Sequence, residues 1–199
     1  RSAECGCAAA RRMLAAPAWM ANPATWRVAL LAAWLAQDGG KLAQALSAAP
    51  ESKYLVAGSG GYGFVASVAD MAARNKAGKA FLAVEKGERP LQPAPLQGDT
   101  VAVLTAGSRL LLFPLAELKE MGKGKGLMLI DLAKSDEVVA VLVAGNQTLH
   151  IDGGGRGGKP SQQPLDVRAQ AAFRGSRARR GQEIPFRLKP SGLSLTRTR

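Results

Sequence analysis

Three stretches of the chain share one pattern of apolar and polar positions. Residues 101–113 (VAVLTAGSRLLLF) line up with residues 139–151 (VAVLVAGNQTLHI), 38 positions further along the chain. An earlier copy, residues 55–65 (LVAGSGGYGFV), precedes the first of these by 46 positions. Self-similarity at such an interval indicates a repeated structural unit.

Each copy predicts a β-hairpin, because a β-rich apolar run meets a turn of small residues and a second apolar run follows. In the first two copies a basic, glycine-rich turn comes after the hairpin at matching distance, at residues 75–82 and 121–128. After the third copy we expect a longer insertion, residues 152–164, before a more strongly basic segment at residues 174–181.

Repeats of about 40 residues with several short strands each are typical of propeller-like folds, in which a blade buries its apolar faces only against its neighbours. The expected fold class is therefore all-β. Residues 65–73 and 114–121 could form short helices, but we interpret them as strand ends and connecting turns. The first 35 residues differ, since they are rich in Ala, Arg, Trp and Pro, and residues 25–36 show helical spacing.

The basic charge of the chain is concentrated near its C-terminal end. The formal net charge is +12 at pH 7. Residues 1–50 hold 5 basic and 2 acidic side chains, residues 51–150 hold 11 and 10, and residues 151–199 hold 11 and 3. Such clustering favours contact with a polyanion, and arginine suits phosphate in particular. Charge alone does not distinguish nucleic acid from an anionic membrane.

The remaining composition excludes several classes of site. Cys5 and Cys7 lie too close in sequence for an ordinary structural disulfide, and a single histidine cannot complete a zinc site of thiolates and imidazoles. Reduced cysteines fit a cytoplasmic protein. The longest wholly apolar run, residues 28–36, is shorter than the ~20 residues of a membrane helix, so we predict no membrane partner. Because the chain begins at Arg1, we expect it to be an internal fragment.

Residues 58–65 match the glycine-rich loop of protein kinases. A kinase also needs a His-Arg-Asp loop and an Asp-Phe-Gly metal site, yet His150 precedes Ile-Asp and no Asp precedes Phe. A dinucleotide site would need a helix directly after these glycines, and residues 64–68 have the composition of a strand. We therefore interpret this segment as part of the hairpin.

Residues 153–159 fit a phosphate-binding P-loop except at the last position, where Pro160 replaces the hydroxyl residue that holds Mg²⁺. We expect a basic, exposed loop instead, whose glycines could still approach a DNA phosphate. A nucleotide-binding domain built on this loop stays open as an alternative.

Several segments together resemble a known domain. Residues 61–65 (GYGFV), 73–80 (ARNKAGKA), 112–115 (LFPL) and 123–126 (KGKG) are similar, in sequence and in order, to the C-terminal domain of the topoisomerase IV A protein, a relative of gyrase A. The similarity covers roughly residues 36–190. It implies a β-pinwheel, a propeller variant whose neighbouring blades exchange strands, with about four blades at least partly visible and a basic outer edge that bends DNA.

On this resemblance we expect the basic side chains of the repeated turns and of the glycine-rich loop to contact DNA phosphates. They are Arg74, Lys76, Lys79, Lys123, Lys125, Arg156, Lys159, Arg174, Arg177, Arg179 and Arg180.

The resemblance also implies that this fragment is not an enzyme. In that family a tyrosine preceded by arginine cleaves DNA in an upstream domain, and ATP and Mg²⁺ act in other domains or subunits. Tyr54 follows Lys53 and Tyr62 follows Gly61, so neither fits, and we expect no cofactor or metal here. The implied partners are double-stranded DNA, the rest of the topoisomerase IV A protein, its ATPase partner topoisomerase IV B and, as a further candidate, a chromosome-organising complex. The implied location is the nucleoid in a bacterial cytoplasm.

This resemblance divides the chain into three parts. Residues 1–35 do not match the expected first blade, so they are either a divergent blade or a mis-framed stretch. Residues 36–190 are the expected pinwheel, and residues 191–199 the expected tail. The related gyrase A protein carries a Gln-Arg-Arg-Gly-Gly-Lys-Gly box in its first blade. In this chain only residues 156–159 (RGGK) resemble part of that box, which favours topoisomerase IV. A propeller-like interaction module that binds an acidic partner is the alternative from another class.

Overall fold

The computed structural model describes residue 46 and residues 48–72, 79–155 and 159–196, together with the backbone of β1 (Arg12–Leu14) and β2 (Ala33–Leu35). The described residues form several antiparallel sheets and a few short helices, which confirms the predicted all-β class. Strand β2 pairs with β1 and lies where the spacing of residues 25–36 predicted a helix. The rest of residues 1–35 lies outside the described part of the chain.

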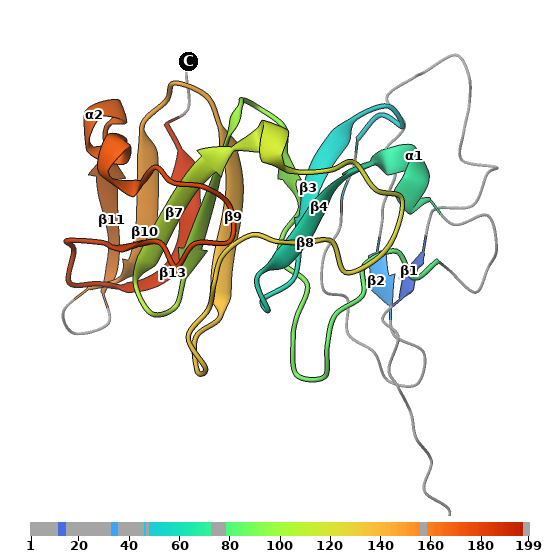
Figure 1. The fold of residues 1–199 in the computed structure, drawn as a ribbon, viewed down its shortest axis with the longest axis horizontal. Coiled ribbons are helices and arrows are strands. Elements are labelled where there is room, and N and C mark those ends of the chain that lie inside the picture. Colours follow the sequence, from blue (N-terminus) through green and yellow to red (C-terminus); the bar gives the residue numbers. More distant parts are fainter. Residues whose placement is uncertain are drawn as a thin grey trace, which may run out of the picture.

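Three sheets stand side by side, and we call them blades 1, 2 and 3 (Figure 1). Blade 1 has the order β5 (Ala94–Pro95), β3 (Lys53–Ala57), β4 (Tyr62–Ser67) and β8 (Leu127–Met128). Blade 2 has the order β9 (Val138–Ala144), β6 (Thr100–Thr105), β7 (Arg109–Pro114) and β12 (Gln182–Glu183). Blade 3 has the order β13 (Lys189–Leu195), β10 (Leu149–Gly154) and β11 (Pro160–Leu165).

Neighbouring blades exchange their outermost strands. Strand β8 follows the hairpin of blade 2 in sequence, yet it pairs with β4 of blade 1, Gly63 opposite Leu127. Strand β12 follows the hairpin of blade 3 and pairs in the same way with β7 of blade 2, Leu110 opposite Gln182. This exchange is the β-pinwheel arrangement that the resemblance implied.

The hairpins predicted at residues 55–65 and 101–113 are confirmed as β3–β4 and β6–β7, but the one at residues 139–151 is wrong. Strand β9 pairs with β6 and closes blade 2, whereas β10 opens blade 3 and pairs with β11 and β13. Both β6 and β9 lie between two cores, so both have an apolar pattern, although β6 begins a hairpin and β9 does not. The supposed insertion at residues 152–164 is largely the β10–β11 hairpin.

A short helical segment follows the second strand of each hairpin, and in the first two, at residues 65–73 and 114–121, we predicted only strand ends and turns. These are α1 (Val68–Met71), η2 (Leu115–Glu117), and α2 (Val167–Gln170) with η4 (Ala171–Phe173). The Ser67 hydroxyl accepts the Asp70 N–H and the Asp166 carboxylate accepts the Ala169 N–H. These side-chain caps start a single helical turn as soon as the strand ends.

The segment expected to be a tail, residues 191–199, begins inside a strand. Strand β13 runs to Leu195 and pairs with β10 along its length, Leu149 opposite Leu195. Leu193 and Leu195 pack against the core between blades 2 and 3. Their alternation with polar residues is the pattern of a strand with one buried face.

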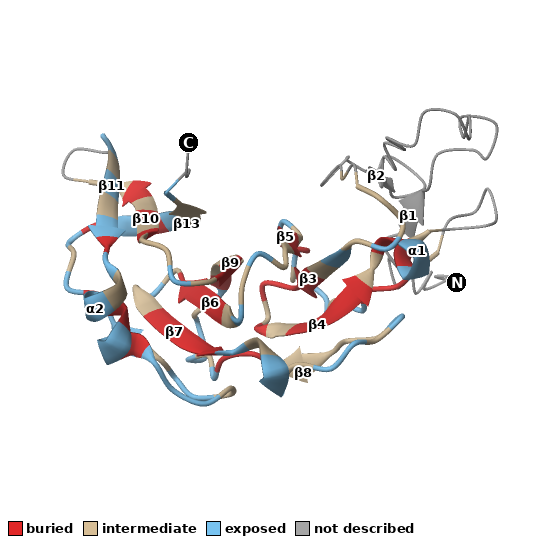
Figure 2. Ribbon diagram, turned by 90° about the horizontal axis from the view of Figure 1, so that it is seen from above, coloured by how far each residue is buried: buried red, intermediate tan, exposed pale blue. Residues whose placement is uncertain are grey.

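The cores lie between the blades, and the strands β6, β7 and β9 of blade 2 each contribute to two of them. In β6, Val101 and Val103 face blade 1, while Ala102 and Leu104 face blade 3. Strand β7 divides its residues in the same way, with Leu111 and Phe113 in one core and Leu110 and Leu112 in the other. All eight side chains are buried, as the strands β6 and β7 show in Figure 2.

Two glycines fix the close contact between exchanged strands. Gly126 and Gly181 immediately precede β8 and β12, and both have positive φ, +86° and +74°. A Cβ on Gly126 would lie 2.4 Å from the Gly63 carbonyl oxygen, and one on Gly181 would lie 2.9 Å from the Leu110 carbonyl oxygen. A side chain at either position would push the exchanged strand away from the neighbouring blade.

Replacing Gly126 by Ala tests this contact, and Gly87→Ala is the matched control. Gly87 has φ +91° but nothing within 4 Å of its Cβ position. We expect Gly87→Ala to cost about 1–2 kcal/mol of unfolding free energy through the positive φ alone. Gly126→Ala should cost at least about 1–3 kcal/mol more, because backbone must also move. Urea denaturation measures both, and equal losses would show that the close approach is unimportant.

Candidate nucleic-acid interface

After η2 and after η4 the chain crosses to the outer edge of the preceding blade, and each of these crossings carries a basic turn. Around the second turn, residues 121–128, the Val65 N–H donates to the Lys119 carbonyl at 3.1 Å and the Met121 N–H to the Val65 carbonyl at 2.8 Å. In the third turn, residues 174–181, the Gly175 N–H donates in the same way to the Leu112 carbonyl at 2.8 Å. Figure 2 shows β8 and its approach along the side of the molecule opposite β5 and β9.

In the second turn, one lysine is free in solvent and the other is held. Lys123 is exposed. The Lys125 ammonium forms an ion pair with Glu85 of the preceding repeat and lies 3.9 Å from the centre of the Tyr62 ring. The hydrogen bond that Lys125 donates to Glu85 is the main cause that raises the pKa of Lys125 above its ordinary value, and burial opposes it. Both contacts favour the charged form at this position.

The third turn has the same organisation, with arginines in place of lysines. Arg180, like Lys125, directly precedes the glycine of positive φ, and its Nε lies 3.6 Å from a carboxylate oxygen of Asp131 in the preceding repeat. Arg174 and Arg179 are exposed. The two turns therefore present exposed cations at the outer edges of consecutive blades.

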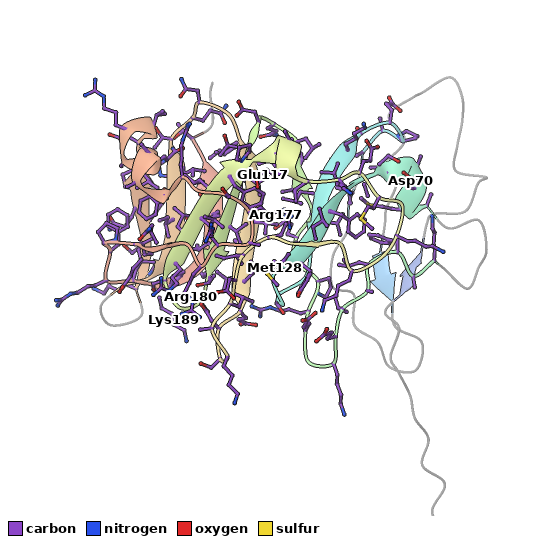
Figure 3. The ribbon with its side chains drawn as sticks, in the orientation of Figure 1. Asp70, Glu117, Met128, Arg177, Arg180 and Lys189 are labelled. Atoms are coloured by element: carbon purple, nitrogen blue, oxygen red, sulfur yellow. The ribbon has the colours of Figure 1, made fainter. Side chains whose placement is uncertain are left out.

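Arg177 is the exception, because it serves the fold (Figure 3). Its Nη1 donates to the Met128 carbonyl of β8 at 2.7 Å, and its backbone N–H donates to Glu117 Oε2 at 2.8 Å. Its Nε is buried without a hydrogen-bond partner among the described residues. The guanidinium thus ties the third turn to the second, and only part of it faces solvent.

The other predicted contact residues are less well grouped. Lys79 is half-buried and donates to the Asp70 carbonyl. Lys159 is exposed, but it lies in the β10–β11 loop and not in a basic turn. This loop joins two antiparallel strands, whereas a P-loop leads from a strand into a helix, so the nucleotide-binding alternative is wrong. Arg74, Lys76 and Arg156 lie outside the described residues.

Sequence reasoning missed two cations near blade 3. Arg187 and Lys189 are exposed and line an open groove of about 1010 Å³ between the β6–β7 turn, at Ala106 and Ser108, and the start of β13. The charge excess of residues 151–199 includes them. They do not belong to a repeated turn, so the repeat gave no reason to select them.

The described part of the chain offers little else that could support chemistry. Within it, no group of three or more His, Cys, Asp or Glu side chains is placed to hold a metal ion. A search of the same residues finds no helix of the length and apolarity needed to cross a membrane.

Comparison with known proteins identifies the family. The model described as "DNA gyrase C-terminal domain, beta-propeller" matches residues 99–144, which form most of blade 2. The DNA topoisomerase 4 A protein of Neisseria gonorrhoeae is 35% identical over 150 residues, covering 72% of this chain and 20% of that protein. The Escherichia coli ParC C-terminal domain superposes with a TM-score of 0.70 at 26% identity, over 79% of this chain and 65% of that one. The chain is a C-terminal β-pinwheel domain of the gyrase A and topoisomerase IV A family.

Further matches agree with this pinwheel assignment. The DNA topoisomerase 4 A protein of Pseudomonas aeruginosa is 35% identical over 146 residues, 68% of this chain and 19% of that protein. A structure of the C-terminal domain of DNA topoisomerase IV shares the fold, with a TM-score of 0.63 at 12% identity, over 81% of this chain and 52% of that one. The pinwheel chain spans about a fifth of the length of the curated relatives it matches.

The Lys125 ion pair gives a testable titration. Since the folded-state pKa is raised, the pair stabilises the fold below the ordinary lysine pKa and loses this effect as pH rises through the folded value. We expect Glu85→Gln to lower the pKa of Lys125, measured by NMR of its side-chain carbons. Glu88→Gln is the control, because Glu88 is the weakest of the contributors. Equal shifts in both variants would rule out the hydrogen bond as the main cause.

Proposed function

We propose that the basic turns bind the phosphate backbone of double-stranded DNA along the outer edge of the blades. The observation that carries this proposal is the repeated placement of exposed cations on consecutive blades, Lys123 on the edge of blade 1 and Arg174 and Arg179 on the edge of blade 2. A line of separated positive charges matches the regular phosphates of a duplex better than it matches an irregular acidic protein surface.

The backbone of the turns supports the same proposal. Glycines flank the cations, at Gly122, Gly124 and Gly126 in the second turn and at Gly175 and Gly181 in the third. At Gly122 and Gly124 no backbone of the neighbouring blade packs against the position of the missing side chain, so a phosphate could approach the main chain closely there. The turns are also held firmly, since their hydrogen bonds to β4 and β7 fix them to the blades. A rigid edge loses little entropy when DNA binds.

Contacts of this kind position DNA without reading its bases. Lysine and arginine on an outer edge reach phosphates, whereas base recognition requires an element that enters a groove. We therefore expect binding that is independent of sequence and strongly weakened by salt. DNA that follows a curved row of charges is bent towards the protein.

In the parent protein we propose that this domain presents a DNA segment to the topoisomerase for decatenation and supercoil relaxation. The family assignment supports this role, and its partners would be DNA, the rest of the topoisomerase IV A protein and the ATPase topoisomerase IV B. The domain itself would be catalytically silent, and DNA cleavage and ATP hydrolysis would belong to other parts of the enzyme. It would act in a bacterial cytoplasm, at the nucleoid.

The salt dependence of DNA binding tests the proposal. We expect the triple variant Lys123→Ala, Arg174→Ala, Arg179→Ala to reduce the slope of log affinity against log salt by about one for each lost phosphate contact. Fluorescence anisotropy with a short duplex at several salt concentrations measures this slope. Lys134→Ala is the control, because Lys134 is exposed and basic but lies between β8 and β9, outside the turns. We expect its slope to match that of the unaltered chain.

Two results would contradict the proposal. A log–log plot that is flat for the unaltered chain would exclude phosphate neutralisation, and an unchanged slope in the triple variant would place binding elsewhere. Ring closure of short DNA fragments separates the remaining alternative. An acidic protein partner predicts no change in closure, whereas a DNA-bending edge increases it.

A further inference from the structure

The third basic turn is one residue longer than the second, although both run between equivalent points of the fold. In the second turn the bridge to β4 forms at Glu120, and the glycine of positive φ, Gly126, follows six positions later. In the third turn the bridge to β7 forms at Arg174, and Gly181 follows seven positions later. One residue has therefore been added between these two points.

Alignment from both ends places the added residue at Ala178. Counted forward from the bridge, Arg177 takes the position of Lys123, and counted back from the glycine, Arg179 takes the position of Gly124. Ala178 remains between them. Its φ is +62°, a conformation that residues with a side chain rarely adopt.

The main-chain hydrogen bonds agree with this alignment. In the second turn the Gly124 N–H donates to the preceding repeat at 2.8 Å, and the Gly124 carbonyl accepts from that repeat at 2.9 Å. In the third turn two residues share these bonds. The Ala178 N–H donates to the Leu129 carbonyl at 3.0 Å, and the Arg179 carbonyl accepts from the Asp131 N–H at 3.0 Å.

With the added residue in place, Arg177 is half-buried where Lys123 of the second turn is exposed. Arg177 Nη1 donates to the Met128 carbonyl in β8 at 2.7 Å, and the Arg177 backbone N–H donates to Glu117 Oε2 in η2 at 2.8 Å (Figure 3). Glu117 and Met128 lie at the two ends of the crossing that carries Lys123. Arg177 therefore holds both ends of the neighbouring basic segment.

The burial of this guanidinium favours a positioning role over contact with phosphate. Arg177 Nε is buried without a hydrogen-bond partner among the described residues, which costs free energy. An arginine that served only to contact DNA would keep its N–H groups in water until DNA arrived. Arg179, which follows the added residue, is exposed and supplies the outward cation of this turn.

We propose that Arg177 is a positioning residue that fixes the second and third basic turns relative to each other and thereby sets the bend of bound DNA. The proposal rests on the proposed function. Duplex DNA is stiff over distances much longer than two blades, so a bent duplex pulls on the turns that bind it. Turns that could shift would keep their phosphate contacts while the DNA straightened. Arg177 resists this shift through Met128 and Glu117 and does not touch the DNA.

Replacing Arg177 by Ala separates positioning from phosphate contact. We expect the slope of log affinity against log salt to stay unchanged, because no phosphate contact is lost. The rate of ring closure of short DNA fragments, measured at saturating protein, should fall at least about threefold, because the duplex is bent less. Arg179→Ala is the matched control, and its salt slope should fall by about one.

Two further variants of the full chain guard against a general loss of stability. Glu117→Ala removes the second contact of Arg177 and leaves every cation in place, so we expect slower ring closure at an unchanged salt slope. Leu193→Ala weakens the core between blades 2 and 3 from β13, outside both turns. We expect its ring-closure rate to stay within about twofold of that of the unaltered chain. Urea denaturation checks that each variant unfolds cooperatively, and Glu117→Ala decides if Arg177→Ala does not fold.

The outcomes distinguish this proposal from the proposed function. A salt slope that falls by about one in Arg177→Ala would make Arg177 a phosphate contact and overturn the positioning role alone. Unchanged ring closure in Arg177→Ala and Glu117→Ala would overturn it as well, and so would an equal loss in Leu193→Ala. A flat salt dependence of the unaltered chain would instead overturn the proposed DNA binding, and the positioning role with it.

Discussion

Each internal sheet of this domain is apolar on both faces, and this constraint organises the rest of the molecule. Strands β6 and β7 send alternate side chains into the two cores that flank blade 2. A sheet of this kind cannot stand alone in water, because burying one face leaves the other exposed. Each blade is therefore stable only between neighbours, and exchange of β8 and β12 adds main-chain hydrogen bonds across the same boundaries. Packing and pairing hold the blades in one fixed arrangement.

The arrangement of blades determines where the charges lie. A basic turn must lead into an exchanged strand, and the glycine that allows the strand to approach the neighbouring blade comes at the end of that turn. The cation just before this glycine then meets a carboxylate of the preceding repeat, as Lys125 meets Glu85 and Arg180 meets Asp131. These pairs are partly exposed, so they contribute little stability. They orient the turn and leave the remaining cations directed to solvent.

The sequence predicted the class of the fold and two hairpins, because alternation and small-residue turns are local signals. It could not distinguish β9 from the first strand of a hairpin, since an apolar run records burial on both faces and not the identity of the pairing partner. The caps at Ser67 and Asp166 were too short a signal to reveal α1 and α2. Lys123, Arg174 and Arg179 lie exposed in the basic turns, and their contact with DNA stays a prediction. The role of Arg177 could not be predicted, because its partner Met128 lies in another repeat and the same residue type can clamp a carbonyl or face solvent.

The two outermost described faces of the blades differ in their chemistry. The face of blade 1 that points away from blade 2 is apolar, with Val56, Phe64 and Phe81 buried in it, and Leu46 from upstream of β3 packs against it. Such a surface must be covered, since an apolar sheet face does not stay in water. On the corresponding far face of blade 3, the Asp152 carboxylate instead accepts hydrogen bonds from Gln162 and Ser194. Further packing is therefore required on the far face of blade 1, and Leu46, upstream of β3, supplies part of it.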